Sequence, residues 1–105
     1  MSVRCVVPKR VDRNQKSIVE ALRKVGATVW HTHEAGKGAP DIVVGFRGGN
    51  YLFEIKDGEL PPSRRTLTDE EEIFHQEWKG QVDVIHTSGE ALEKMGMELT
   101  PVEES

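Results

Sequence analysis

Two mainly apolar segments, residues 41–46 and 51–57, flank the short sequence RGGN at residues 47–50. Runs of β-branched and aromatic residues on either side of a glycine-rich turn are typical of a β-hairpin. Because side chains alternate along a strand, each residue of such a hairpin can be assigned to one of its two faces. A four-residue turn would pair Phe46 with Tyr51, so that the numbers of paired residues sum to 97.

Three ionisable residues, Asp41, Glu54 and Lys56, interrupt this hairpin at its open end. In the register above, Asp41 lies directly opposite Lys56, within about 5 Å, and diagonal to Glu54, within about 7–8 Å. Glu54 and Lys56 alternate onto one face of their strand, which an ordinary surface ion pair would also explain. Two carboxylates this close repel each other unless a cation lies between them. Oxygen ligands without softer donors favour Mg²⁺ or Mn²⁺, so the hairpin predicts a metal site.

Residues typical of helix ends indicate where helices begin and end in the rest of the chain. We expect three helices, which begin at Asp12, Thr68 and Thr87 and are ended by Gly26, Gly80 and Gly96. Each begins with an acceptor side chain followed three residues later by glutamine or glutamate, namely Gln15, Glu71 and Glu90. Residues 28–33 and 82–87 are typical of further strands. The order helix, three strands, helix, strand, helix predicts an α/β fold with a mixed sheet flanked by helices.

The length and the charge of the chain fit a single small domain. At 105 residues, we expect residues 12–96 to form the core, 1–11 a lead-in and 99–105 a tail. The net charge is −4, but residues 1–65 hold twelve Lys or Arg against seven Asp or Glu, whereas residues 66–105 hold two against eleven. This division allows a basic nucleic-acid-binding face. The acidic part is also what a solvated helix face and tail would give.

Some classes of protein are disfavoured. No stretch approaches the roughly 18 apolar residues of a membrane helix. The charged N-terminus lacks the apolar core of a signal peptide, so we expect a cytoplasmic protein that does not associate with a membrane. The single cysteine, Cys5, excludes an internal disulfide and a cysteine-rich zinc site.

The ionisable residues of the hairpin also match a known motif. Pro40-Asp41, twelve intervening residues and Glu54-Ile55-Lys56 resemble the signature of the PD-(D/E)XK nuclease superfamily. The wider context, GAPDIVVG at residues 38–45 and YLFEIKDG at 51–58, is similar to the VRR-NUC domain, a compact branch that is common in bacteriophages and resembles Holliday junction resolvases. The likeness extends over roughly residues 12–92 and includes SRRTLT at 63–68, followed by Phe74, His75, Trp78 and Gly80.

This resemblance implies roles for individual residues. Asp41 and Glu54 would bind Mg²⁺, which Mn²⁺ could replace, together with the backbone carbonyl of Ile55. Lys56 would orient or deprotonate the attacking water and offset charge on the phosphorane. A divalent ion polarises a phosphoryl oxygen and makes hydroxide available near neutral pH. The implied activity is that of a metal-dependent DNA endonuclease, whose in-line attack leaves a 5′-phosphate and a 3′-hydroxyl.

Two positions depart from the family pattern. Family members often carry a glutamate ligand on the first helix, where this chain has Asn14-Gln15. Gln15 could bind the metal through its amide oxygen, hold a water, or only cap the helix. The second helix often carries a glutamine where this chain has Glu71, which either caps that helix or also lies beside the site.

Further residues are candidates for contacts around the site. Arg64 and Arg65, in a proline-containing loop after the catalytic strand, together with Lys37 and Arg13, are expected to bind DNA phosphates. His75 is expected to pack near the site. His31 and His33 would share a strand face, which makes a transition-metal pair conceivable. We expect Trp30, Phe74 and Trp78 to anchor the core.

Three functions therefore remain open. The first is a Mg²⁺-dependent endonuclease that acts on branched or structured DNA in the cytoplasm of a bacterial or phage-infected cell. We expect it to act as a homodimer, because the chain is small and because family members of this type resemble junction resolvases. The second is a catalytically silent DNA-binding module of the same fold. The third is an accessory subunit whose acidic second half docks another protein.

Overall fold

The structure is a computed structural model that describes residues 10–58 and 66–97, with only the backbone described for residues 10–13. Its elements follow in the order α1 (Arg10–Lys24), β1 (Thr28–His31), the 3₁₀ turn η1 (His33–Ala35), β2 (Ile42–Phe46), β3 (Gly49–Ile55), α2 (Asp69–Glu77), β4 (Asp83–Ile85) and α3 (Ser88–Lys94). The predicted order of helices and strands is confirmed. Among the helices of the described ranges, none is long and apolar enough to cross a membrane.

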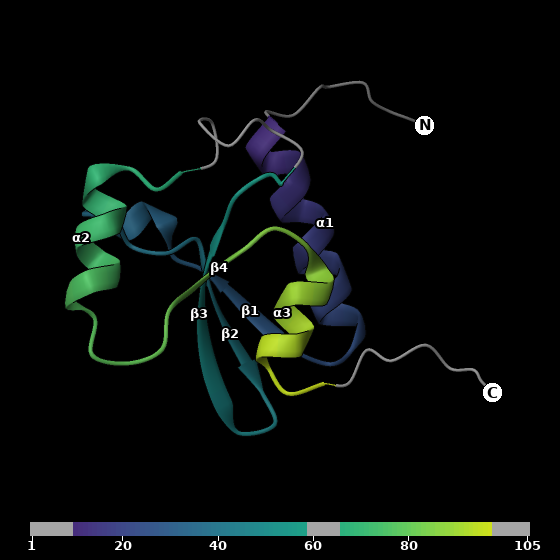
Figure 1. The fold of residues 1–105 in the computed structure, drawn as a ribbon. Coiled ribbons are helices and arrows are strands. Elements are labelled where there is room, and N and C mark those ends of the chain that lie inside the picture. The colour runs from purple at the N-terminus through teal and green to yellow at the C-terminus, as the bar shows by residue number, and fades with distance from the viewer. Residues whose placement is uncertain (1–9, 59–65, 98–105) are drawn as a thin grey trace.

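The strands form a mixed four-stranded sheet in the order β1-β2-β3-β4. The β1–β2 and β2–β3 pairs are antiparallel, and the β3–β4 pair is parallel, because α2 and its flanking segments carry the chain back to the edge of the sheet. Helices α1 and α3 cover one face, whereas α2 and η1 lie on the other side (Figure 1). The predicted α/β class with a mixed sheet flanked by helices is thus confirmed.

The hairpin turn is shorter than expected. Phe46 pairs with Gly49, so that Arg47 and Gly48 alone form the turn, with φ values of 51° and 84°. Positive φ at both central residues is what a two-residue type I′ turn requires, and this turn matches the twist of the flanking strands. Paired positions consequently sum to 95, since Ile42 pairs with Phe53, and the predicted pairing of Asp41 with Lys56 is wrong. Asp41 directly precedes β2, and its N–H donates to the carbonyl of Phe53.

The hydrophobic core fills the space between the sheet and the α1–α3 layer. Its fully buried side chains are Ile18, Leu22, Ile42, Val44, Phe53 and Ile85. Helix α2 contributes no buried residue. The expectation that Trp30 and Trp78 anchor the core is wrong, because they are 69% and 44% exposed. Trp30 pairs with Val43 on the face turned away from the core, and Trp78 stacks on the half-buried Phe74 with ring centroids 5.2 Å apart.

The first helix begins earlier than its capping signal predicted. Helix α1 starts at Arg10, so Asp12 lies in its first turn rather than at its cap, and the predicted capping box with Gln15 is wrong. An acidic residue is favoured by the helix dipole both at the N-cap and within the first turn. The sequence alone therefore does not distinguish these two positions. The capping signals at Thr68 and Thr87 are confirmed, since each side chain accepts a hydrogen bond from the N–H group three residues later.

Candidate metal centre

Asp41 is held in place by the strands on both of its sides. Its N–H donates to the Phe53 carbonyl at 3.1 Å, and its carbonyl accepts from the Thr32 N–H at 2.9 Å. The Thr32 hydroxyl donates to the Pro40 carbonyl at 2.8 Å, which fixes the preceding residue as well. The Asp41 carboxylate reaches across the hairpin, where its Oδ2 accepts the Ile55 N–H at 2.7 Å. One carboxylate oxygen is therefore committed to β3, and the side chain has a fixed orientation.

Glu54 is a buried carboxylate on the face of the sheet turned away from the core. Only 2% of the residue is exposed. Its Oε2 lies 3.5 Å from the Lys56 Nζ, whereas its Oε1 is buried and has no hydrogen-bond partner. A buried polar atom without a partner carries a desolvation cost of roughly 1–3 kcal/mol, and more when it is charged. A cation bound between Glu54 and Asp41 would remove this cost.

The two facing carboxyl groups hold protons more tightly than usual in the metal-free protein. Burial raises the pKa of Asp41, against the opposing effect of its hydrogen bond from Ile55. Burial, followed by repulsion from Asp41 and Glu71, raises the pKa of Glu54 to about 9. Both effects disfavour a second negative charge in this small volume, and a divalent cation would reverse them by favouring the two ionised forms.

Lys56 lies between two carboxylates. Its Nζ is 2.9 Å from the Glu71 Oε1 and 3.5 Å from the Glu54 Oε2. Burial alone would lower the pKa of Lys56, but the hydrogen bond from its ammonium to Glu71 and the negative charges of Glu54 and Glu71 outweigh it and raise the pKa. The amine is therefore an ammonium group at neutral pH.

Glu71 takes part in two sets of contacts. It forms the predicted capping box of α2, in which its Oε1 accepts the Thr68 N–H at 2.9 Å and its own N–H donates to the Thr68 hydroxyl at 3.2 Å. The same oxygen accepts the Lys56 ammonium. Burial would raise the pKa of Glu71, but these hydrogen bonds, first that of Lys56, outweigh it and lower the pKa. The side chain is thus both a helix cap and a neighbour of the site.

Gly38 joins the loop that carries Asp41 to the first turn of α2. A Cβ at this position would clash with the Glu70 carbonyl, and φ is +78°. Only glycine combines this backbone conformation with so close an approach. The segments that carry Asp41 and Glu71 are consequently packed backbone against backbone. No sequence pattern announced this contact, because it joins residues more than thirty positions apart.

The first helix reaches the same end of the sheet. The Asn14 Nδ2 donates to the Lys56 carbonyl at 3.3 Å, and the Gln15 Nε2 lies 3.1 Å from the His31 Nδ1. Gln15 is therefore engaged by the end of β1, and its role as a metal ligand stays a prediction. His33 belongs to η1 rather than to β1, so the expectation that His31 and His33 share a strand face is wrong.

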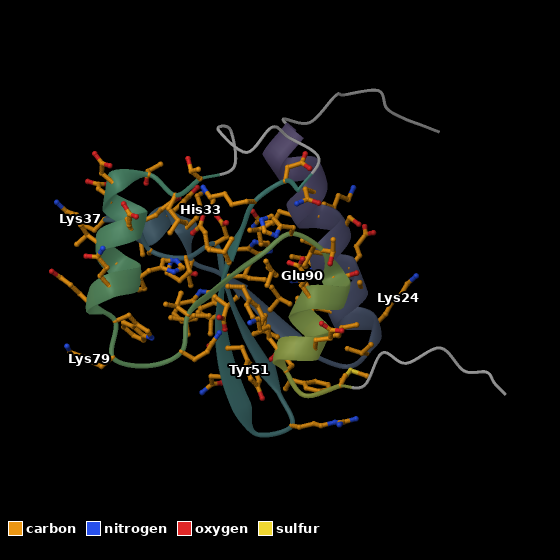
Figure 2. All side chains as sticks on the ribbon, viewed as in Figure 1. Lys24, His33, Lys37, Tyr51, Lys79 and Glu90 are labelled. Carbon is orange, nitrogen blue, oxygen red and sulfur yellow. The ribbon has the colours of Figure 1, made fainter. Side chains whose placement is uncertain are left out.

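The remaining candidates are only partly placed. Lys37 is exposed in the loop before β2 and points outward beside α2 (Figure 2). His75 is half-buried on α2, and its Nε2 is buried without a hydrogen-bond partner. Arg64 and Arg65 lie outside the described residues, as does the side chain of Arg13. Their predicted contacts with DNA stay predictions.

The residues present fit a hard divalent cation. Asp41 and Glu54 offer oxygen ligands, and the Glu54 Oε1 is unpartnered. Within residues 10–58 and 66–97, no group of three or more His, Cys, Asp or Glu residues is placed to hold a metal ion. The described side chains thus offer two acidic candidate ligands, and Mg²⁺ commonly binds through one or two carboxylates while keeping several waters.

The fold is similar to that of a solved structure described as a VRR_NUC domain. The TM-score is 0.63 at 22% sequence identity, and the match covers 86% of this chain and 100% of the other. The fold expected from the sequence resemblance is therefore confirmed. No family model matches the sequence, and no curated protein matches it.

Proposed function

We propose that this chain is a metal-dependent endodeoxyribonuclease that binds Mg²⁺, or Mn²⁺ in its place, between Asp41 and Glu54. The observation that carries the proposal is the buried, unpartnered Oε1 of Glu54 beside the fixed Asp41 carboxylate. The similarity of the fold to a VRR_NUC domain supports a nuclease-type domain. The Ile55 carbonyl and the Gln15 amide oxygen remain candidates for further ligands.

The roles of the side chains follow from their charges. A bound divalent ion would polarise the phosphoryl oxygen and make hydroxide available near neutral pH. Asp41 and Glu54 supply two negative charges on one side of the scissile phosphate. Lys56, whose pKa is raised, supplies a positive charge that orients the attacking water and offsets the charge that develops on the phosphorane. Its ammonium form favours this role over that of a general base.

DNA is the substrate class that we propose, bound through its phosphates. Lys37, Arg13, Arg64 and Arg65 are the candidate contacts, and each would make the affinity more salt-dependent. The first turn of α2 contains Asp69, Glu70, Glu71 and Glu72. This acidic turn would repel a DNA backbone, so we expect the DNA to cross the site on the side of α1.

We also propose that the protein acts as a homodimer. Trp30, Ile73 and Trp78 are exposed large hydrophobic side chains on the side of the sheet opposite the core, and a second copy would cover apolar surface there. Two-fold symmetry would present two sites to two DNA strands, as cleavage of a branched substrate requires. Light scattering coupled to gel filtration measures the mass. We further propose that the protein acts in the cytoplasm of a bacterial or phage-infected cell.

A gel assay tests the proposed activity. The purified protein is incubated with Mg²⁺, Mn²⁺ or EDTA on supercoiled, linear, flapped and four-way-junction DNA. We expect metal-dependent products on the branched DNA that end in 5′-phosphate. The absence of products on every substrate, despite DNA binding, would favour a catalytically silent DNA-binding module. The observation that keeps this alternative in view is that the described residues contain no group of three or more His, Cys, Asp or Glu side chains placed to hold a metal ion.

A further inference from the structure

We infer that Glu71 is a positioning residue that holds the Lys56 ammonium closer to itself than to Glu54 and thereby limits the competition between Lys56 and the metal ion for Glu54. This inference rests on the proposed function, because it assumes that Asp41 and Glu54 bind a divalent cation. Glu71 itself is not a ligand in this proposal. Its effect on the metal passes through Lys56.

The Lys56 ammonium contacts two carboxylates and lies closer to that of Glu71 than to that of Glu54. The Lys56 Nζ is 2.9 Å from Glu71 and 3.5 Å from Glu54, so the shorter contact is the one to the helix. The Glu54 Oε2 faces Lys56, while the Glu54 Oε1 remains unpartnered. An ammonium group released from Glu71 would have Glu54 as its nearest described anion. It would then compete with a metal ion for the same carboxylate.

Glu71 is fixed independently of Lys56. The capping box ties its carboxylate and its N–H to Thr68, and the close approach of Gly38 ties its backbone to the Asp41 loop. These contacts hold the carboxylate in place before any cation binds. Because α2 has no buried residue, its packing does not explain why a carboxylate of its first turn lies at this site.

If Glu71 had only a structural role, the Mg²⁺ affinities of the variants would differ from those that the positioning role predicts. If Glu71 only caps α2, the loss of Thr68 and the loss of Glu71 should have the same consequences, since both break the capping box. If Glu71 acts directly on the neighbouring Glu54 carboxyl group instead, its removal should change metal binding whether or not Lys56 is present. The positioning role predicts an effect that depends on Lys56.

Calorimetric titration of Mg²⁺ into the full-length wild type and five variants separates these cases. The variants are Glu71→Ala, Glu71→Gln, Thr68→Ala, Lys56→Ala and the double variant Lys56→Ala/Glu71→Ala. We expect Glu71→Ala to weaken Mg²⁺ binding roughly 3- to 10-fold, as directly coupled residues do. Glu71→Gln keeps an acceptor for both Thr68 and Lys56, so it should fall between Glu71→Ala and the wild type. Thr68→Ala loses the hydroxyl but keeps the backbone N–H that binds the Glu71 carboxylate, so it should lower the melting temperature and leave the Mg²⁺ affinity unchanged.

The double variant gives the decisive comparison. In the Lys56→Ala background, the further change Glu71→Ala should not alter Mg²⁺ affinity. An equal weakening with and without Lys56, or an equal weakening by Thr68→Ala, would overturn the inference while leaving the metal site intact. Wild-type affinity in Glu71→Ala would overturn it as well. If the wild type binds no Mg²⁺, the proposed function fails, and the inference fails with it.

Discussion

Asp41 and Glu54 face each other across the β2–β3 hairpin, with the Asp41 Oδ2 fixed by the Ile55 N–H at 2.7 Å and the Glu54 Oε1 left without a partner. Burial raises the pKa of both carboxyl groups, and repulsion from Asp41 raises that of Glu54 further, so without a cation the site disfavours two negative charges. Lys56 lies near Glu54 but is closer to Glu71. A divalent cation is the partner that this geometry lacks.

The raised pKa of Glu54 predicts how stability depends on pH in the absence of metal. Between the ordinary pKa of 4.5 and the folded-state pKa of about 9, the folded protein binds more protons at Glu54 than the unfolded chain does. Stability from this group is therefore present below pH 4.5 and is lost as the pH rises towards 9. We expect Glu54→Gln to be more stable than the wild type in EDTA, by a margin that grows by at least about 1 kcal/mol between about pH 5 and about pH 8.

Urea unfolding of both proteins at the two pH values measures this margin. The difference between the proteins reports the Glu54 carboxyl group together with its effect on the pKa values of Lys56 and Glu71. A margin that is constant or that shrinks with rising pH would show that Glu54 is not a buried, repelled carboxyl group.

The capping boxes show what local sequence could predict. Thr68 and Glu71 form the full capping box, whereas at Thr87 only the bond from the Glu90 N–H forms and the Glu90 carboxylate accepts the His86 N–H instead. The bonds at Thr68 and Thr87 were predictable because they span only three residues. The hairpin was predictable as an element, but its register was not. The sequence RGGN permits a two-residue or a four-residue turn, and the choice depends on Arg47 adopting a positive φ of 51°. That shift of register removed the predicted pairing of Asp41 with Lys56.

Other features depend on tertiary packing that sequence patterns do not encode. The motif placed Asp41, Glu54 and Lys56 at one end of the hairpin, and the structure brings them together there on one face. The contact between Lys56 and Glu71 and the approach of Gly38 to Glu70 join segments far apart in the chain. Trp30 was misjudged because its burial depends on which face of the sheet the helices cover.

Lys56 is expected to act in the transition state rather than in substrate binding. We predict that Lys56→Ala lowers kcat roughly 10²- to 10³-fold, as the loss of a single charge-stabilising group does, with little change in KM. Lys79→Ala is the matched control, because Lys79 is exposed and points outward at the far end of α2 (Figure 2). Steady-state cleavage of a labelled junction measures both constants. A pure rise in KM for Lys56→Ala would instead identify a phosphate-binding lysine.

The contact of Gly38 with α2 predicts that alanine destabilises the protein more at Gly38 than at Gly36, in the same loop. Gly36 and Gly38 have similar φ values of +82° and +78°, but a Cβ at Gly36 meets nothing within 4 Å, whereas one at Gly38 clashes with the Glu70 backbone. Both alanine variants should lose about 1 kcal/mol or more of stability from the strained φ. Gly38→Ala should lose clearly more and should also weaken Mg²⁺ binding. Thermal unfolding and calorimetry compare the two, and equal losses would argue against packing of the loop on α2.

The central claim is that Asp41 and Glu54 together bind one divalent ion, and titration of Mg²⁺ followed by calorimetry tests it most directly. The wild type should bind one Mg²⁺ per chain, and Asp41→Asn and Glu54→Gln should each abolish the binding while remaining folded. Wild-type affinity in either variant, or no binding by the wild type, would contradict the claim.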